Sequence, residues 1–405
     1  MAAEATEPYD PYQGHSPTVT WFELFYDLVV VASVGLTNDV FLDRPTWQNA
    51  VLAAVTMAAL AWVWFLTTLF NNLFPGQDLL RRALLLAQMA AIAIAGLAID
   101  QDHGIDNRIG LLAYAAALAI VGALITWGAR STPRRVRLRV IGPIAIAAAI
   151  CVVGAIDDHY RSGLYLVAAL LVSMLPILLM QYSEWREESM IRLDHLRERL
   201  GLFVLIILGE GFAQLVSALH FLGTIPRADL FALLFVLSFA VWWIYFDGTF
   251  SDYTDLVHVR WRLTLLAHLT LIFGIVGTVD VLVLLAAGEA TELGDEALAY
   301  FVICLSLVLL SFAALTFTAK GRLGVQGWLQ LACGLLIVSI GLVLVPRDDT
   351  STNAVILLSA AVVIGNAVIA VWADANERRH EWRSSLGVAF RGTHEPRTDR
   401  EPPMA

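Results

Sequence analysis

The sequence predicts an all-α integral membrane protein of about twelve transmembrane helices, arranged as two parallel six-helix repeats. Three observations support this fold class. Hydrophobic residues make up 58% of the 405 residues and charged residues only 15%, against roughly 25% charged in a soluble domain. Apolar runs recur along the chain, each close to the roughly 20 residues that a helix needs to cross a bilayer. Basic residues collect in every second loop between these runs, as they do on the cytoplasmic side of a membrane.

Each predicted span is an apolar run bounded by charges or by residues that favour turns. The loops between spans are short and contain prolines such as Pro45, Pro133 and Pro226, which mark turns and helix ends. No loop is long enough to hold a soluble domain. The twelve runs cover residues 20–42, 48–70, 80–99, 109–129, 138–156, 161–182, 199–219, 229–247, 263–287, 297–319, 326–345 and 353–373.

The distribution of Lys and Arg orients these spans. With the N-terminus and the loops after even-numbered spans on one side, 21 of the 26 basic residues fall on that side and 5 on the other. The loop after the fourth span alone contains Arg130, Arg134, Arg135, Arg137 and Arg139. Because basic loops stay in the cytoplasm, we expect both termini to be cytoplasmic. Adding or removing one span would scramble this alternation, so the distribution also supports the count of twelve.

The two halves of the chain resemble each other at an offset near 180 residues. The stretch RALLLAQM at 82–89 aligns with RLTLLAHL at 262–269, and tryptophan-rich stretches at 61–66 and 240–245 correspond. Six spans per half is an even number, so the repeats would share one orientation and be related by an axis along the membrane normal. The predicted divisions are a cytoplasmic N-terminal segment, two six-helix halves and a disordered cytoplasmic tail, at residues 1–18, 19–185, 186–374 and 375–405.

Ionisable residues inside the spans mark candidate binding or ion-pathway positions, because each costs roughly 2.5–3.5 kcal/mol near the bilayer centre. Glu23 and Asp27 lie one helical turn apart in the first span, although acids at a helix N-terminus are equally explained by the helix dipole. Glu210 is the deepest acid. Gln214 follows it by one turn and Arg199 precedes it by three turns, so the three share a stripe. A buried structural pair, or a protonated Glu210 bonded to another helix, is the alternative.

Five further polar residues extend this set of candidates. His268 lies about two turns into the ninth span, where hydrogen-bonded packing and a proton relay both explain a histidine. Asp280 lies deeper in the same span. Asp247 ends the eighth span near the interface. His195 and Glu198 come just before the seventh span. A charged helix entry explains them there as well as a binding role does.

Several motifs of common enzyme and binding sites are absent from the sequence. It contains no HExxH, no GxSxG and no Gly-rich phosphate loop. Its three cysteines lie singly in apolar runs with no CxxC spacing, which indicates neither a disulfide framework nor a zinc site. We therefore expect no metal, no cofactor, no nucleic-acid partner and no enzyme of a common soluble class. The expected partners are the lipid bilayer and an unidentified ion or small molecule.

Three runs carry a resemblance to a known family. They are WFELFYDLVVVASVGL at the first span, HLRERLGLFVLIILGEGF at the seventh and WWIYFD at the eighth. Together they resemble the bacterial low temperature requirement A (LtrA) membrane proteins, and the resemblance covers most of the chain. It implies a bacterial inner membrane but no biochemical activity, because the family name reflects growth in the cold. It also implies recurring polar positions at Glu23, Asp27, His195, Glu198, Arg199, Gly209, Glu210 and Asp247.

The architecture and the interior acids favour a transporter or channel-like permease for an ion or small solute. In this hypothesis the pathway runs between the two halves. The alternatives are a membrane-embedded enzyme or sensor that uses Glu210 and His268 as acid and base, and a scaffold that transports nothing.

A reporter fused after Arg139 tests the predicted orientation. Because the arginines of this loop hold it in the cytoplasm, we expect a fluorescent protein that matures only in the cytoplasm to be bright there. The same reporter fused after Asp348, in an acidic loop on the opposite side, should be dark. A periplasmic signal after Arg139 would overturn the orientation.

Overall fold

The structure is a computed structural model that is helical almost throughout. The residues it describes are 19–37, 40–41, 44–76, 78–98, 107–130, 134–157, 162–179, 192–222, 227–249, 257–286, 293–347 and 351–392. The predicted segment 1–18 and the end of the predicted tail, 393–405, lie outside them. Within the described residues there are twelve α-helices, one π-helix and no strand. These elements are α1 (Trp21–Leu36), α3 (Trp47–Leu73), α4 (Leu79–Leu97), α5 (Asn107–Gly128), α6 (Arg134–Ile156), α7 (Ser162–Leu179), α9 (Leu193–Leu222), α10 (Ala228–Trp243), the π-helix η1 (Ile244–Thr249), α11 (Val257–Ala286), α12 (Asp295–Lys320), α13 (Gly324–Leu344) and α14 (Thr352–Gly392).

The helices occur where the sequence predicts membrane spans. Each of the twelve predicted spans falls on one of them, and the eighth is shared by α10 and η1. Among the described residues, nine stretches are long and apolar enough to cross a bilayer, on α3, α4, α5, α6, α10 with η1, α11, α12, α13 and α14. The remaining three helices are α1, with 16 residues, α7 and α9. The chain is therefore a multi-span membrane protein.

The start of α1 is determined locally by a capping box. Thr20 is the N-cap, its hydroxyl accepts a hydrogen bond from the Glu23 backbone N–H, and the Glu23 carboxylate accepts one from the Thr20 backbone N–H at 3.0 Å. This reciprocal pair satisfies two of the backbone donors that a helix leaves free at its start. The capping box also fixes the position of Glu23, and through the helical register that of Asp27.

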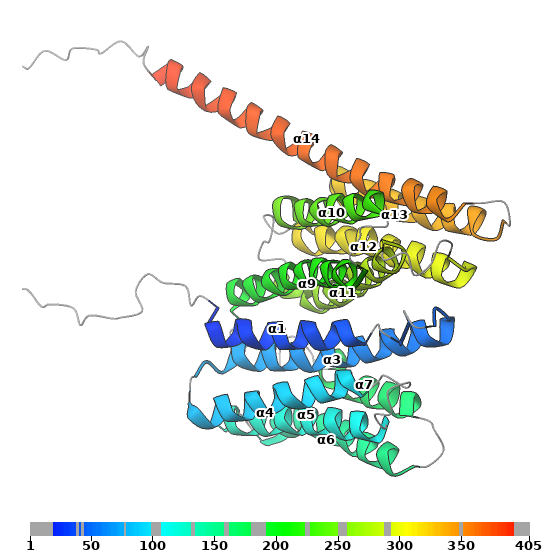
Figure 1. Cartoon of the computed structure of the whole chain (residues 1–405). Coiled ribbons are helices and arrows are strands. Elements are labelled where there is room, and N and C mark those ends of the chain that lie inside the picture. Colours follow the sequence, from blue (N-terminus) through cyan, green and yellow to red (C-terminus); the bar gives the residue numbers. More distant parts are fainter. Residues whose placement is uncertain are drawn as a thin grey trace, which may run out of the picture.

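The helices of each half pack on one another in the same series. In the first half α4 packs on α5, α5 on α6 and α6 on α7; in the second half α11 packs on α12, α12 on α13 and α13 on α14. Likewise α1 packs on α4 as α9 packs on α11, and α3 on α7 as α10 on α14. In Figure 1 α1–α7 gather at one end of the bundle and α9–α14 at the other, with α1 and α3 facing α9 and α11 between them.

Helix α3 is central, whereas α6 and α13 are peripheral. About 72% of the apolar stretch of α3 is buried inside the protein, against 28% for the stretches on α6 and α13. The exposed side chains of the peripheral helices include large apolar ones, such as Leu138 and Leu342, as expected of a surface in contact with lipid. The central position of α3 brings Trp64 and Thr68 into the protein interior.

The end of the chain differs from the prediction. Disorder was predicted from residue 375, but α14 continues as a helix to Gly392 and projects beyond the bundle in Figure 1. The segment 373–392, which follows the predicted span, contains three Ala, two Glu and four Arg, which are good helix formers. A helix that is already nucleated within the bilayer can therefore extend at small cost.

The contact between α1 and α4 depends on Gly96. A Cβ atom at this position would lie 2.7 Å from the backbone oxygen of Ser33, a distance that neither backbone can accommodate without moving. Small residues at helix crossings in membranes permit this close approach.

We expect Gly96→Ala to destabilise the protein by about 1–3 kcal/mol because it overpacks this crossing. The matched control is Gly142→Ala on α6, where a Cβ atom would meet nothing within 4 Å. Thermal unfolding in detergent measures both variants. Equal Tm values for the two would contradict the close α1–α4 crossing.

Candidate functional site

One arginine joins the two halves of the protein. Arg199 on α9 extends between the two acids of α1: its Nη1 lies 3.0 Å from Oε1 of Glu23, and its Nη2 bonds Oδ1 of Asp27. The side chains of Arg199 and Asp27 are both completely buried. The sequence predicts all three residues as candidates, but the structure pairs Arg199 with α1 and not with Glu210 of its own helix.

Helix α3 supplies two neutral partners to this ion pair. The indole Nε1 of Trp64 donates to Oδ1 of Asp27 at 2.6 Å, and Nη2 of Arg199 donates to the hydroxyl of Thr68 at 3.3 Å. Phe203 of α9 packs against the Trp64 ring with their centroids 4.0 Å apart. Oδ1 of Asp27 thus accepts two hydrogen bonds, and the orientation of its carboxylate is determined by two different helices.

His195 extends the cluster to the entry of α9. Its Nε2 lies 3.4 Å from Oε2 of Glu23, and its Nδ1 lies 3.4 Å from the amide nitrogen of Asn72. Since that amide nitrogen can only donate, Nδ1 is the acceptor and the Nε2–H points at Glu23. Asn72 also exchanges two hydrogen bonds with the backbone of Arg192, at 2.8 and 2.9 Å. The ends of α3 and α9 are therefore held together. We call Glu23, Asp27, Trp64, Thr68, His195 and Arg199 the ion-pair cluster.

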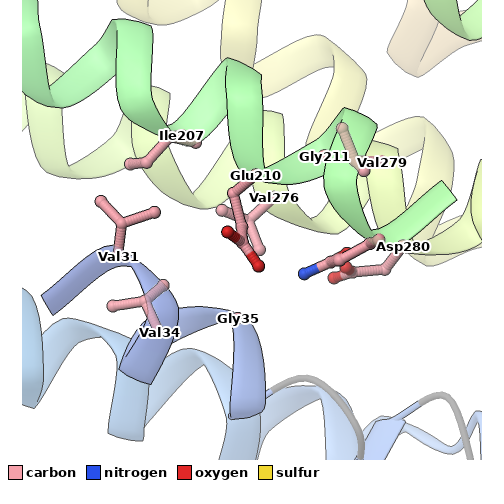
Figure 2. Close-up of a pocket in the computed structure, with 10 residues that line it drawn as sticks. Val31, Val34, Gly35, Ile207, Glu210, Gly211, Val276, Val279 and Asp280 are labelled. Atoms are coloured by element: carbon pink, nitrogen blue, oxygen red, sulfur yellow. The ribbon is translucent and has the colours of Figure 1, made fainter. Parts of the chain in front are cut away.

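A second polar site lies farther along α1 and α9. Glu210, Gln214 and Asp280 line a small, partly open hollow between α1, α9 and α11, with room for about one water molecule. Figure 2 shows the Glu210 carboxylate pointing toward Val34 and Gly35 of α1, with Asp280 on the neighbouring helix. The remaining lining residues have apolar side chains or are glycines: Val31, Val34, Gly35, Ile207, Gly211, Val276 and Val279. We call this space the outer hollow.

Two glycines make room for the outer hollow and its walls. A Cβ atom on Gly35 would lie 3.0 Å from Nε2 of Gln214 and 3.4 Å from Oε1 of Glu210. A Cβ atom on Gly211 would lie 2.9 Å from Cγ1 of Val279. Any larger residue at Gly35 would therefore push against the polar groups themselves.

The outer hollow has the chemistry of a site for a proton or a hard cation. Two carboxylates and one amide supply only oxygen atoms as potential ligands, and hard cations prefer oxygen. Within the described residues no group of three or more His, Cys, Asp and Glu side chains is arranged to hold a metal ion. A transient cation, a proton or a solute with a donor group suits these walls better than a tightly held metal.

His268 belongs to neither polar site. Its Nε2 lies 3.0 Å from the hydroxyl of Tyr245, and its Nδ1 lies 2.7 Å from the carbonyl oxygen of Thr264. Because a carbonyl only accepts, Nδ1 carries the proton and Nε2 accepts from Tyr245. His268 is twelve residues from Asp280 on α11, about 18 Å of helical rise. The structure therefore does not bring Glu210 and His268 together as the acid and base of an enzyme.

The part of the chain that contains both sites also shows its family. Residues 18–375 match the family described as Bacterial low temperature requirement A protein (LtrA). The chain belongs to the LtrA family. It is also similar to an uncharacterized protein of Rhizobium meliloti (strain 1021), with 28% identity over 242 residues. That match covers 56% of this chain and 58% of the relative, so the chain spans less than two thirds of the relative's length.

The two other predicted site residues of this LtrA protein lie apart from both sites. Glu198 is half-buried on α9 and takes no part in the contacts of the ion-pair cluster. Asp247 lies exposed on η1. Both positions recur in the family resemblance, but neither side chain lines the outer hollow.

Three residues of α3 are missing from the predicted site. Trp64, Thr68 and Asn72 each contact the ion-pair cluster or its entry. They follow one another at intervals of four residues, so they lie along one face of a helix. The sequence already contained this polar stripe on an otherwise apolar span. Only the tertiary structure shows that its side chains bond Asp27, Arg199 and His195.

The ion pair of Arg199 should contribute strongly to the stability of this LtrA protein. We expect Arg199→Gln to cost about 3–5 kcal/mol, because it leaves two carboxylates without their cation in a buried site. The double variant Asp27→Asn/Arg199→Gln should cost less than the sum of the two single changes.

The control is Asp229→Asn, which removes an exposed ion pair with Arg227 whose atoms lie 2.7 Å apart. Exposed pairs are worth at most about 1 kcal/mol. The two single variants, the double variant and Asp229→Asn are each compared with wild type by thermal unfolding in detergent. If Arg199→Gln lowers the Tm no more than Asp229→Asn does, Arg199 does not form the buried ion pair described here.

Proposed function

We propose that this LtrA protein is a permease for an ion or a small solute, with its pathway along the seam where α1 meets α9 and α11. The observation that carries this proposal is the outer hollow, because Glu210 and Asp280 place two carboxylates in one space between helices of different halves. Acids inside a membrane bundle are costly and mark pathways for ions or substrates. The ion-pair cluster lies on the same two helices, α1 and α9.

The two sites divide the seam into a binding space and a barrier. Along α1, Asp27 and Gly35 are eight residues apart, about 12 Å of helix; along α9, Arg199 and Glu210 are eleven residues apart, about 16 Å. Polar groups thus follow one line through about half of the bilayer core. The outer hollow would receive the solute, and the densely bonded ion-pair cluster would block its passage until the bonds rearrange.

The packing of the two halves suggests how the bonds of the ion-pair cluster could rearrange. In our proposal, α1–α7 and α9–α14 are parallel six-helix repeats, which agrees with the matching series of helix contacts in each half. Transporters built from repeats often move one repeat against the other around a central site. In this LtrA protein the helices at the junction are α1 and α9, and the bonds that such a motion would break are those of Arg199.

The proposed orientation places the ion-pair cluster nearer to the cytoplasm than the outer hollow. With both termini in the cytoplasm, the start of α1 and the start of α9 are cytoplasmic. The ion-pair cluster then lies toward the cytoplasm, and the outer hollow lies toward the periplasm. The outer loops are acidic in sequence, for example at Asp100, Asp102 and Asp106, which would raise the local concentration of cations at that side.

Transport by the purified protein in liposomes tests this proposal. Proton, sodium and potassium fluxes are measured under imposed gradients for wild type, Glu210→Gln and Asp229→Asn. We expect a flux in wild type that Glu210→Gln lowers at least about tenfold, since neutralising one of two carboxylates removes on the order of 1.4 kcal/mol or more of cation binding.

The exposed Asp229 is the matched control, because Asp229→Asn also removes one carboxylate but lies outside the seam. It should leave the flux unchanged. If no ion or solute moves under any gradient in the wild-type protein, the permease proposal fails. A flux that is equal in wild type and Glu210→Gln would remove the outer hollow from the pathway.

A further inference from the structure

We propose that Asp27 is a proton-binding site, and that a proton bound there releases the contact between α1 and α9. This inference rests on the proposed permease and assigns the proton as its coupling ion. The observation that carries it is an imbalance within one carboxylate. Oδ1 of Asp27 accepts hydrogen bonds from Arg199 and Trp64, whereas Oδ2 is buried and has no hydrogen-bond partner among the described residues.

A buried carboxylate oxygen without a hydrogen-bond partner is unfavourable because it carries part of an unsolvated charge, and protonation removes that charge. Desolvation removes the water that would stabilise the charge, and the missing hydrogen bond removes the usual compensation. The Asp27 side chain is completely buried, so solvent does not supply a donor in this conformation. Protonation of Oδ2 neutralises the carboxylate without having to displace either donor from Oδ1.

The charges around Asp27 permit one added proton. Helix α1 packs on α3, α4 and α9. The α3 groups at Asp27 are the neutral Trp64 and Thr68; α9 supplies Arg199, with His195 bonded to Glu23. The buried cation of α4 is Arg81, which donates to the side chain of Asn71 and whose charge acts on Glu23. Among the described residues, the one cation bonded directly to Asp27 is Arg199, and Glu23 shares it.

The protonation of Asp27 involves the transfer of one proton. A hydronium ion gives its proton to Oδ2 of Asp27 and leaves as water, so one O–H bond forms and one breaks. Asp27 becomes neutral, and Arg199 keeps Glu23 as its counter-ion. Hydrogen bonds to a charged carboxylate are roughly twice as strong as those to a neutral group. The bonds from Arg199 and Trp64 to Asp27 weaken, and these are the bonds that hold α1 against α9 and α3.

A proton could reach Asp27 from either end of α1. One turn toward the start of α1 is Glu23, which faces the Nε2–H of His195 and is slightly exposed at that end. Two turns in the other direction is Gly35, in the wall of the outer hollow. A proton site in this position can be reached from one side before the bonds of Arg199 break and from the other side afterwards.

Infrared spectroscopy of the full-length protein in lipid tests the site without any transport. On acidification we expect a carboxylic C=O band that shifts in D₂O. The band should be lost in Asp27→Asn, kept in Glu23→Gln and Asp229→Asn, and restored in Asp27→Glu, which retains a carboxyl group. A band that survives in Asp27→Asn, or one that Glu23→Gln removes instead, overturns the proposal.

Flux in liposomes that contain a pH-sensitive dye tests the coupling. In wild type we expect transport to rise as the outside pH is lowered and to acidify the interior; in Asp27→Asn the flux should lose this pH dependence, and in Asp27→Glu it should regain it. Flux in wild type without the infrared band overturns the proton site alone. The Asp27 band without flux in wild type overturns the permease alone, so the two failures are distinguishable.

Discussion

The single guanidinium of Arg199 is the interaction on which the arrangement of this protein depends. It bonds two carboxylates from the opposite half of the chain while it is completely buried. Bringing these three charges out of water costs several kcal/mol for each ion, and the cost is offset only when geometry and hydrogen bonding are good. Trp64, Thr68 and the capping box at Thr20 provide that geometry. The register of α1 against α9 therefore follows from the position of one side chain.

The two polar sites use the same helices in different ways. The ion-pair cluster is dense, because Arg199 and His195 both contact acids of α1, although Oδ2 of Asp27 and Nε of Arg199 have no hydrogen-bond partner among the described residues. The outer hollow is open, with apolar walls and glycines that leave its carboxylates room. In the proposed permease, the open site would hold the solute while the bonded site keeps the other end of the seam closed. The family name LtrA is compatible with this division but does not specify it.

The agreement between prediction and structure differs from residue to residue. Glu23 and Asp27 were predicted at the start of the first span and His195 and Arg199 at the entry of the seventh, and the structure brings all four together. Glu210 and Gln214 were predicted on one stripe with Arg199, and they line a separate site with Asp280. His268 was predicted as a partner of Glu210 in the enzyme alternative, but it bonds Tyr245. The predicted disordered tail is helical as far as Gly392.

The sequence by itself determined the membrane class, the position of each helix, the family and most of the buried ionisable groups, although it did not single out Arg81. It could do so because hydropathy, span length and the spacing of charges are local properties of the chain. Only the tertiary structure decided which of these groups meet. Asp27 and Arg199 are 172 residues apart, and the rotation and crossing of their helices depend on close contacts such as that of Gly96 with Ser33. Helical periodicity places a side chain on a face, but only packing decides which other helix lies opposite that face.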